Sequence, residues 1–356
     1  MISYLALEEQ YSSIADSVEE DLRNCLRKCH YVTGHYIERF ERTLGNLLYA
    51  NHVTSINNST EAYAVIIEAL GIRPDDYVIV PNNAALESMA GLLRAVRPIF
   101  VDVSPDTYLI DMEQVEKTLL SHPKRKKIKA IVVVDLYGQQ PNMEQISEFA
   151  REHKISIIED ASHAIGSTHR NKHVGYYSHI VMASFQPEYN LGSIGQGAAI
   201  ITNDSMLSKK IRTIISEDPR DVQMNSLVAA QLYHSIKNLF EWNARRRDIA
   251  RIYNDEFNSD QRPTQQPCGK HVYTMYQFKC KDNEQRHDIT KALLENNIGY
   301  SVTFRKVLSE PLVGMMETPV AHELCGTLIS LPCNPFMTKA EVIEVILSIQ
   351  TSLKIS

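Results

Sequence analysis

Apolar residues recur every three or four positions near the start of the chain, which predicts an amphipathic helix over residues 9–30. Gly34 then interrupts the pattern, and a second helix is expected over about residues 36–49. The helical pattern returns later, over residues 208–217 and over the long stretch 224–257. Helices therefore precede and follow a central region with a different pattern.

In that central region, short apolar runs alternate with helical segments. A first strand begins at Val53, and further strands are expected at 77–80, 98–103 and 129–136, with helices at 83–95 and 112–121 between them. This alternation predicts an α/β fold with a large, doubly wound, mostly parallel sheet. Ligands of such sheets sit beyond the carboxyl ends of the strands.

The last part of the chain predicts a smaller α+β unit. A strand is expected over 272–280, followed by helices over 284–297 and 339–353. We expect a large domain over 1–220 and a small C-terminal domain over 221–356 that includes the long connecting helix, with the N-terminal helix as a candidate to pack on the small domain.

Composition narrows the function classes. The 356 residues are 44% hydrophobic and 22% charged, with a net charge of -6, which disfavours a nucleic-acid surface. The start of the chain lacks a basic segment, and no apolar run approaches membrane-spanning length. The six cysteines form no CxxC pair, so we expect reduced thiols and a cytoplasmic protein. We expect no metal site, because His169 and His173 lie in a polar link that is better explained as a solvated loop.

The most informative stretch reads Ser-Phe-Gln-Pro-Glu-Tyr-Asn-Leu-Gly-Ser-Ile-Gly-Gln-Gly over residues 184–197. It resembles the DegT/StrS family of nucleotide-sugar aminotransferases, fold-type I enzymes that use pyridoxal phosphate (PLP). The positions that match the family's motif are Ser184, Phe185, Pro187, Asn190, Leu191, Gly192, Gly195 and Gly197. In this register Tyr189 stands where the family has the lysine that binds PLP as an imine. No lysine occurs between Lys172 and Lys209 to replace it.

A turn from strand to helix at Asn57, Asn58, Ser59 and Thr60 offers free N–H groups, hydroxyls and the positive end of a helix dipole. These features suit an anion, although an ordinary helix cap explains them equally well. The resemblance implies that Ser59 and Thr60 contact the PLP phosphate.

Asp160 is expected at the end of a buried hydrophobic strand, where a carboxylate is costly unless it is paired. The resemblance implies that its partner is the protonated pyridine nitrogen of PLP, with His163 near the cofactor hydroxyl. It also implies cofactor contacts for Ser184 and Asn190.

The chain departs from the family's pattern at several cofactor contacts. Ala85 replaces an aromatic residue that covers the pyridine ring, which removes a stacking contribution of roughly 0.5–1.5 kcal/mol. Asp221 and Gln223 replace an asparagine and an arginine that bind the phosphate of the neighbouring subunit, so a cation is lost and a carboxylate is gained. Tyr189 cannot form an imine, because a phenol does not condense with an aldehyde.

Three hypotheses follow for the function. The first is a degenerate homologue in nucleotide-sugar, surface-polysaccharide or amino-sugar biosynthesis, which acts as a binding or partner subunit, as a homodimer or with an active relative. The second is an enzyme that holds PLP or pyridoxamine phosphate (PMP) noncovalently and acts on a keto-sugar nucleotide, with Tyr189 moving a proton. The phenol would then need a pKa far below its usual value of about 10. The third is ordinary transamination, which loss of the lysine should slow by several orders of magnitude.

Overall fold

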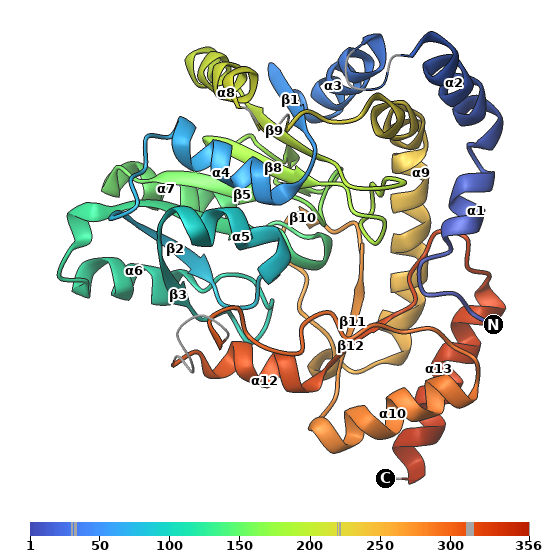
Figure 1. Ribbon diagram of the computed structural model, residues 1–356. Helices are drawn as coiled ribbons and strands as arrows, with labels where there is room; N and C mark the ends of the chain where they lie inside the picture. Colours follow the sequence, from blue (N-terminus) through green and yellow to red (C-terminus); the bar gives the residue numbers. More distant parts are fainter. Residues whose placement is uncertain (30, 32–33, 219, 221, 311–316, 356) are drawn as a thin grey trace.

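A computed structural model describes residues 1–29, 31, 34–218, 220, 222–310 and 317–355 (Figure 1). The helices are α1 (Leu7–Ser12), α2 (Ala15–Lys28), α3 (His35–Leu48), α4 (Ser59–Ala69), α5 (Leu86–Ala95), α6 (Met112–Ser121), α7 (Met143–His153), α8 (Ser205–Glu217), α9 (Ser226–Glu256), α10 (Asn283–Glu295), α12 (Pro319–Thr327) and α13 (Lys339–Ile355). The strands are β1 (His52–Ile56), β2 (Tyr77–Pro81), β3 (Arg97–Val101), β4 (Ile128–Val134), β5 (Ser156–Asp160), β6 (Thr168–His169), β7 (Lys172–His173), β8 (Ile180–Ser184), β9 (Ala198–Thr202), β10 (Gly269–Lys270), β11 (Tyr276–Lys279) and β12 (Leu328–Leu331).

The main sheet has seven strands in the order β1-β9-β8-β5-β4-β2-β3. The strands from β8 to β3 pair in parallel, and β9 runs antiparallel to both β8 and β1. Helices α4, α5 and α8 pack on one face, and α6, α7, α3 and α9 pack on the other. The predicted α/β fold with a large, mostly parallel sheet is therefore confirmed.

Strand side chains alternate between two hydrophobic cores, one on each face of the sheet. In β2, Val78 and Val80 enter the core beneath α4 and α5, whereas Ile79 enters the core beneath α6 and α7. β4 reads as an almost continuous apolar run because both of its faces are covered. Burying one such side chain contributes about 1.5–3 kcal/mol, so the sheet is a rigid platform for the residues at its carboxyl edge.

The C-terminal part is built on the antiparallel pair β11 and β12, flanked by α10, α13 and the end of α9. Its core contains Phe278, Ile329 and Val342, which are all fully buried. The start of the chain joins it: Ile2 forms a bridge with Ile298, and the N-terminus lies beside α13 in Figure 1.

Two polar side chains at the carboxyl ends of β2 and β3 hold the C-terminal part against the main sheet. Asp102 accepts hydrogen bonds from the backbone of Val320 and Ala321 at 3.0 and 2.9 Å, which caps the start of α12. Asn82 accepts a hydrogen bond from the Ser309 backbone at 2.8 Å. The chain after residue 300 is therefore fixed over the edge of the sheet where ligands of α/β proteins bind.

Three local expectations are wrong. The predicted helix over 9–30 is two helices, α1 and α2, because the backbone at Ile14 leaves the helical region. The predicted strand over 272–280 shrinks to β11, since Val272 donates to the Gly138 carbonyl rather than to a neighbouring strand. His169 and His173 lie in β6 and β7 rather than in a solvated loop, and His169 is buried.

Across the part of the chain that the structure describes, no helix combines the length and the apolar character that crossing a bilayer requires.

Candidate functional site

The candidate site is centred on Asp160, the last residue of β5, at the carboxyl edge of the sheet. Its Oδ2 accepts a hydrogen bond from the Tyr63 hydroxyl at 2.9 Å. Its Oδ1 accepts from the backbone and the hydroxyl of Ser162 at 3.1 and 2.6 Å. Both carboxyl oxygens therefore have donors from within the chain.

Burial raises the pKa of Asp160 above its usual value, while the donors on Ser162 and Tyr63 oppose that rise. Tyr63 is completely buried, and burial followed by the charge of Asp160 raises the pKa of its phenol well above 10.0. Tyr63 is therefore a permanent hydrogen-bond donor to Asp160 at physiological pH.

His163 and Tyr189 lie against each other in the same region. Their ring centroids are 4.6 Å apart, and the two ring planes are tilted by 40°. Burial lowers the pKa of His163 to about 4, so its imidazole is neutral at physiological pH. His163 Nδ1 has no hydrogen-bond partner among the described residues. The structure thus brings together Asp160, His163 and Tyr189, the three predicted catalytic positions.

Two further aromatic side chains, Tyr137 and Phe304, extend the cluster of rings that begins at His163. The Tyr137 ring lies 6.5 Å from His163 and 6.4 Å from Phe304, which the C-terminal part supplies. The cavity between Tyr137 and Phe304 has a volume of about 10 Å³. That volume accommodates about one water molecule.

The predicted anion-binding turn is present at the start of α4. Ser59 is buried, Thr60 is half-buried, and the Asn58 side chain caps the helix by accepting from the Glu61 backbone at 3.0 Å. Helix α4 packs against β8, which ends at Ser184. The Ser184 hydroxyl is buried and has no hydrogen-bond partner in the described part of the chain.

Two other predicted cofactor contacts, Asn190 and Ala85, lie in the described part of the chain. Asn190 is fully buried, and its amide nitrogen donates to the Ile165 carbonyl at 2.7 Å and to Asn243 Oδ1 at 3.3 Å. Ala85 is half-buried at the start of α5 and presents only a methyl group. Asn190 thus fastens the turn after β8 to α9, and Ala85 supplies no aromatic surface.

Gln223 is separated from the residues around Asp160. Its exposed side chain lines a surface hollow of about 250 Å³ together with Glu41, Ser55 and Arg212, and none of the other predicted contacts lines that hollow. Asp221 lies outside the described residues.

A buried pair of acidic residues, Asp135 and Glu159, lies next to Asp160. Asp135 follows β4, Glu159 precedes Asp160 in β5, and both side chains are fully buried. Burial, and then the neighbouring Glu159 charge, raise the pKa of Asp135 well above its usual value. Glu159 accepts from the Gly175 backbone and the Ser178 hydroxyl at 3.0 and 2.5 Å. Burial also raises the pKa of Glu159, whereas the hydrogen bonds from Ser178 and Gly175 oppose that rise.

Sequence reasoning missed Tyr63 and Ser162. Tyr63 lies one helical turn after Ser59 on a helix whose other buried residues are mainly aliphatic, and this is the only local signal it offers. Its hydroxyl needs a partner once buried, but the sequence does not identify that partner as Asp160.

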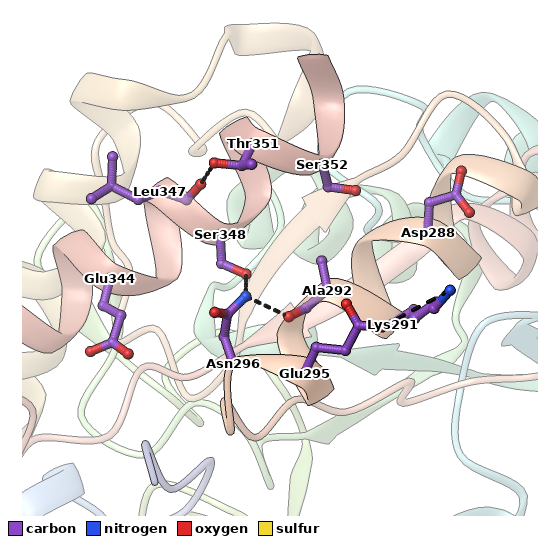
Figure 2. Close-up of a pocket in the computed structure, with 10 residues that line it drawn as sticks. All are labelled: Asp288, Lys291, Ala292, Glu295, Asn296, Glu344, Leu347, Ser348, Thr351 and Ser352. Atoms are coloured by element: carbon purple, nitrogen blue, oxygen red, sulfur yellow. Dashed lines mark hydrogen bonds and ion pairs between the residues drawn. The ribbon is translucent and has the colours of Figure 1, made fainter. Parts of the chain in front are cut away.

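A groove of about 580 Å³ between α10 and α13 is a separate feature (Figure 2). Its polar lining includes Asp288, Glu295, Glu344 and Lys291, and Asn296 crosses it by donating to Ser348 Oγ at 3.1 Å. These groups are solvated or paired. Within the described ranges, no three His, Cys, Asp or Glu side chains are grouped so that they could hold a metal ion.

Comparison with known proteins gives one consistent result. The family model for the DegT/DnrJ/EryC1/StrS aminotransferases matches residues 12–350. The chain is 28% identical to the UDP-2-acetamido-2-deoxy-3-oxo-D-glucuronate aminotransferase of Pseudomonas aeruginosa, over 96% of this chain and 98% of the relative.

Two solved structures share the whole fold. A DegT DnrJ EryC1 StrS aminotransferase from Brucella abortus superposes with a TM-score of 0.91 at 25% identity, covering 99% of both chains. NtdA from Bacillus subtilis with bound PMP superposes with a TM-score of 0.88 at 25% identity, covering 99% of this chain and 85% of NtdA. This chain therefore belongs to the DegT/DnrJ/EryC1/StrS aminotransferase family.

Proposed function

We propose that this chain is a sugar-aminotransferase homologue that does not carry out ordinary transamination and that serves amino-sugar biosynthesis as a binding or partner subunit. The observation that carries the proposal is Tyr189, which we place at the position of the family's lysine. Its ring is 7% exposed and packs on His163. Because a phenol cannot form an imine, the covalent step of transamination has no nucleophile at this position.

The described residues around Asp160 do not fit PLP. We place Asp160 where the family pairs a carboxylate with the pyridine nitrogen, yet both of its oxygens already accept hydrogen bonds from Ser162 and Tyr63. The buried rings of Tyr63 and Tyr189 occupy the space beside Asp160 and His163, respectively. These contacts support a site that no longer takes the cofactor.

The proposed small-molecule partner is a nucleotide sugar, because two of the relatives are named as transaminases of a UDP-linked and of a dTDP-linked sugar. The proposed protein partner is a second copy or an active relative. Asp221 and Gln223, which we place at the phosphate contacts that the family shares between subunits, provide a carboxylate and a neutral amide there. The carboxylate repels a phosphate dianion and the amide lacks the charge of an arginine, which is consistent with a subunit that no longer binds the cofactor.

A second candidate function is an enzyme that holds PMP noncovalently and acts on a keto-sugar nucleotide, as a dehydratase or an aminotransferase. The observation that favours it is the Ser184 hydroxyl, which is buried without a hydrogen-bond partner among the described residues. Leaving such a group unsatisfied costs about 1–3 kcal/mol, and a phosphate oxygen near the start of α4 would satisfy it.

The deciding experiment is a titration of the purified protein with PLP and, separately, with PMP, followed by absorbance and calorimetry. Amine transfer from glutamate to UDP-2-acetamido-2-deoxy-3-oxo-D-glucuronate is assayed on the same preparation, freed of host aminotransferases. We expect no imine absorbance, no binding heat and no transfer above background. Ordinary turnover would contradict the proposal, and tight noncovalent PMP binding would favour the second candidate.

A further inference from the structure

Tyr63 contacts Asp160 directly from α4. It is completely buried on α4, and its hydroxyl donates to Asp160 Oδ2 at 2.9 Å. Because α4 is packed between α5, α8 and the sheet, the Tyr63 ring is held within the core of that face.

The donors around Asp160 form a continuous set from three elements. Ser162 gives its backbone N–H and its hydroxyl to Oδ1, and the same hydroxyl accepts from the Ser184 backbone at 2.9 Å. A buried carboxylate needs donors or a cation to offset desolvation. Here α4 and the turn after β5 supply the donors to Asp160 without a ligand, and the end of β8 holds the Ser162 hydroxyl in place.

Tyr189 closes the site from another side. Its ring lies on His163, and Tyr137 and Phe304 extend the aromatic cluster, with about 10 Å³ left between those two. A pyridine ring could enter only if at least one of the tyrosine rings left its place, because each is buried.

We infer that Tyr63 and Tyr189 form an internal plug, in which the Tyr63 hydroxyl takes one acceptor site on Asp160 Oδ2 and the two phenol rings take the volume that an aromatic nitrogen heterocycle would need. This inference rests on the proposed function, since it takes Asp160 as the family's pyridine-binding position. The plug also goes beyond the proposed function, because it assigns the loss of cofactor binding to Tyr63 as well as to the missing lysine. A lysine at position 189 alone would then not restore binding.

The test measures PMP binding by calorimetry and by the rise in Tm with PMP, for wild type and for plug variants. The opening variants are Tyr63→Leu, Tyr189→Ala and the double variant. Tyr253→Leu is the matched control, because Tyr253 is also completely buried and its hydroxyl also donates at 2.9 Å, to the Pro332 carbonyl in the C-terminal core. Circular dichroism checks that each variant is folded.

We expect at least a tenfold gain in PMP affinity in Tyr63→Leu, a larger gain in the double variant, and no gain in Tyr253→Leu. PMP should raise the Tm of the opened variants only. If Tyr63→Leu does not fold, Tyr63→Met replaces it in the test, because methionine keeps more of the buried apolar volume and adapts to irregular space.

Two results would overturn the plug. One is wild-type protein that already binds PMP as tightly as the opened variants, and the other is no gain in any opening variant that folds. The proposed function fails on a different result, which is ordinary amine transfer by wild type. If wild type shows no amine transfer and no variant gains PMP affinity, only the plug is overturned and the proposed function stands.

A second comparison separates the lysine from the plug. Tyr189→Lys should show no imine absorbance with PLP, whereas Tyr63→Leu combined with Tyr189→Lys should acquire it. An imine in Tyr189→Lys alone would show that Tyr63 does not block the site.

Discussion

The Tyr63 hydroxyl lies 2.9 Å from Asp160 Oδ2, although 97 residues separate the two in the chain. The bond joins α4 to the carboxyl end of β5, on the edge of the sheet where α/β proteins bind their ligands. Neither group is exposed to solvent that could replace the other. The relationship is therefore both a structural link and a constraint on what the site can bind.

Tyr63→Phe should lower the free energy of unfolding by about 2 kcal/mol, because a hydrogen bond to a carboxylate is stronger than one to a neutral acceptor. Tyr253→Phe removes a buried hydroxyl bonded to the Pro332 carbonyl and should cost only about 1 kcal/mol. Urea denaturation of the three proteins measures the difference. Equal losses in the two variants would mean that the bond to Asp160 has no special strength.

Acid should destabilise the protein through His163. Burial lowers the pKa of this imidazole from 6.5 to about 4, so the unfolded chain takes up a proton at a pH where the folded chain does not. The contribution of His163 is complete above pH 6.5 and is lost as the pH falls toward 4. The loss amounts to about 3 kcal/mol.

His163→Gln should flatten that pH dependence when urea denaturation is compared at pH 7 and pH 4.5. His271→Gln is the control, since burial lowers the pKa of His271 to about 3 and it titrates over the same range far from Asp160 in sequence. Each variant should lose less unfolding free energy than wild type between pH 7 and pH 4.5. An unchanged slope in His163→Gln would contradict the assignment of a neutral imidazole.

Asp135 should have the opposite effect on the pH dependence of stability. Its folded pKa is raised well above 3.8 by burial and then by Glu159, so the folded chain holds a proton that the unfolded chain releases. Its contribution is present below pH 3.8 and is lost as the pH rises through the folded pKa. Asp135→Asn removes the titrating carboxyl group, so its stability relative to wild type should be greater at pH 8 than at pH 5. A constant difference between the two pH values would show that Asp135 is not protonated in the fold.

Local patterns predicted most of the sheet. The apolar run expected at 129–136 is β4 (Ile128–Val134), because a strand covered on both faces has an unmistakable composition. Helix α5 begins later than predicted, at Leu86, since Asn82 and Asn83 use their amides to bond Ser309 and the Tyr108 carbonyl. Boundaries set by distant partners are not readable from the local pattern.

Helix α12 was not predicted. It is short, and its first N–H groups are capped by Asp102, which lies 218 residues before Val320. A cap supplied from another part of the fold leaves no signature beside the helix, whereas Asp111 caps α6 from the adjacent position and that helix was predicted with its observed bounds.

Site residues were predictable from the sequence where a polar or ionisable side chain is expected in a buried position. Asp160 stood out because a carboxylate ends an apolar strand, and His163 was identified through the resemblance to the family. Tyr63 did not, because a tyrosine among aliphatic residues on a buried helix is typical of a core. Its role depends on the packing of α4 over β5, which only the folded structure reveals.

The close approach of α4 and α5 holds Tyr63 in place and can be tested with glycine. A Cβ on Gly91 of α5 would lie 1.8 Å from the Thr60 carbonyl oxygen of α4, so Gly91→Ala must push the two helices apart. Overpacking of this kind costs about 1–3 kcal/mol, occasionally more. Gly326→Ala in α12 is the matched control, because nothing lies within 4 Å of its Cβ and alanine is favoured over glycine in a helix by up to about 1 kcal/mol.

Urea denaturation should therefore show Gly91→Ala less stable than wild type and Gly326→Ala equally or more stable. Tyr63 belongs to the displaced helix, so Gly91→Ala should also weaken the hydrogen bond from Tyr63 to Asp160. Tyr63→Phe should therefore lower the free energy of unfolding less in the Gly91→Ala background than in wild type. Additive losses would mean that α5 moves and leaves α4 fixed. In that case the position of Tyr63 is set by the sheet alone.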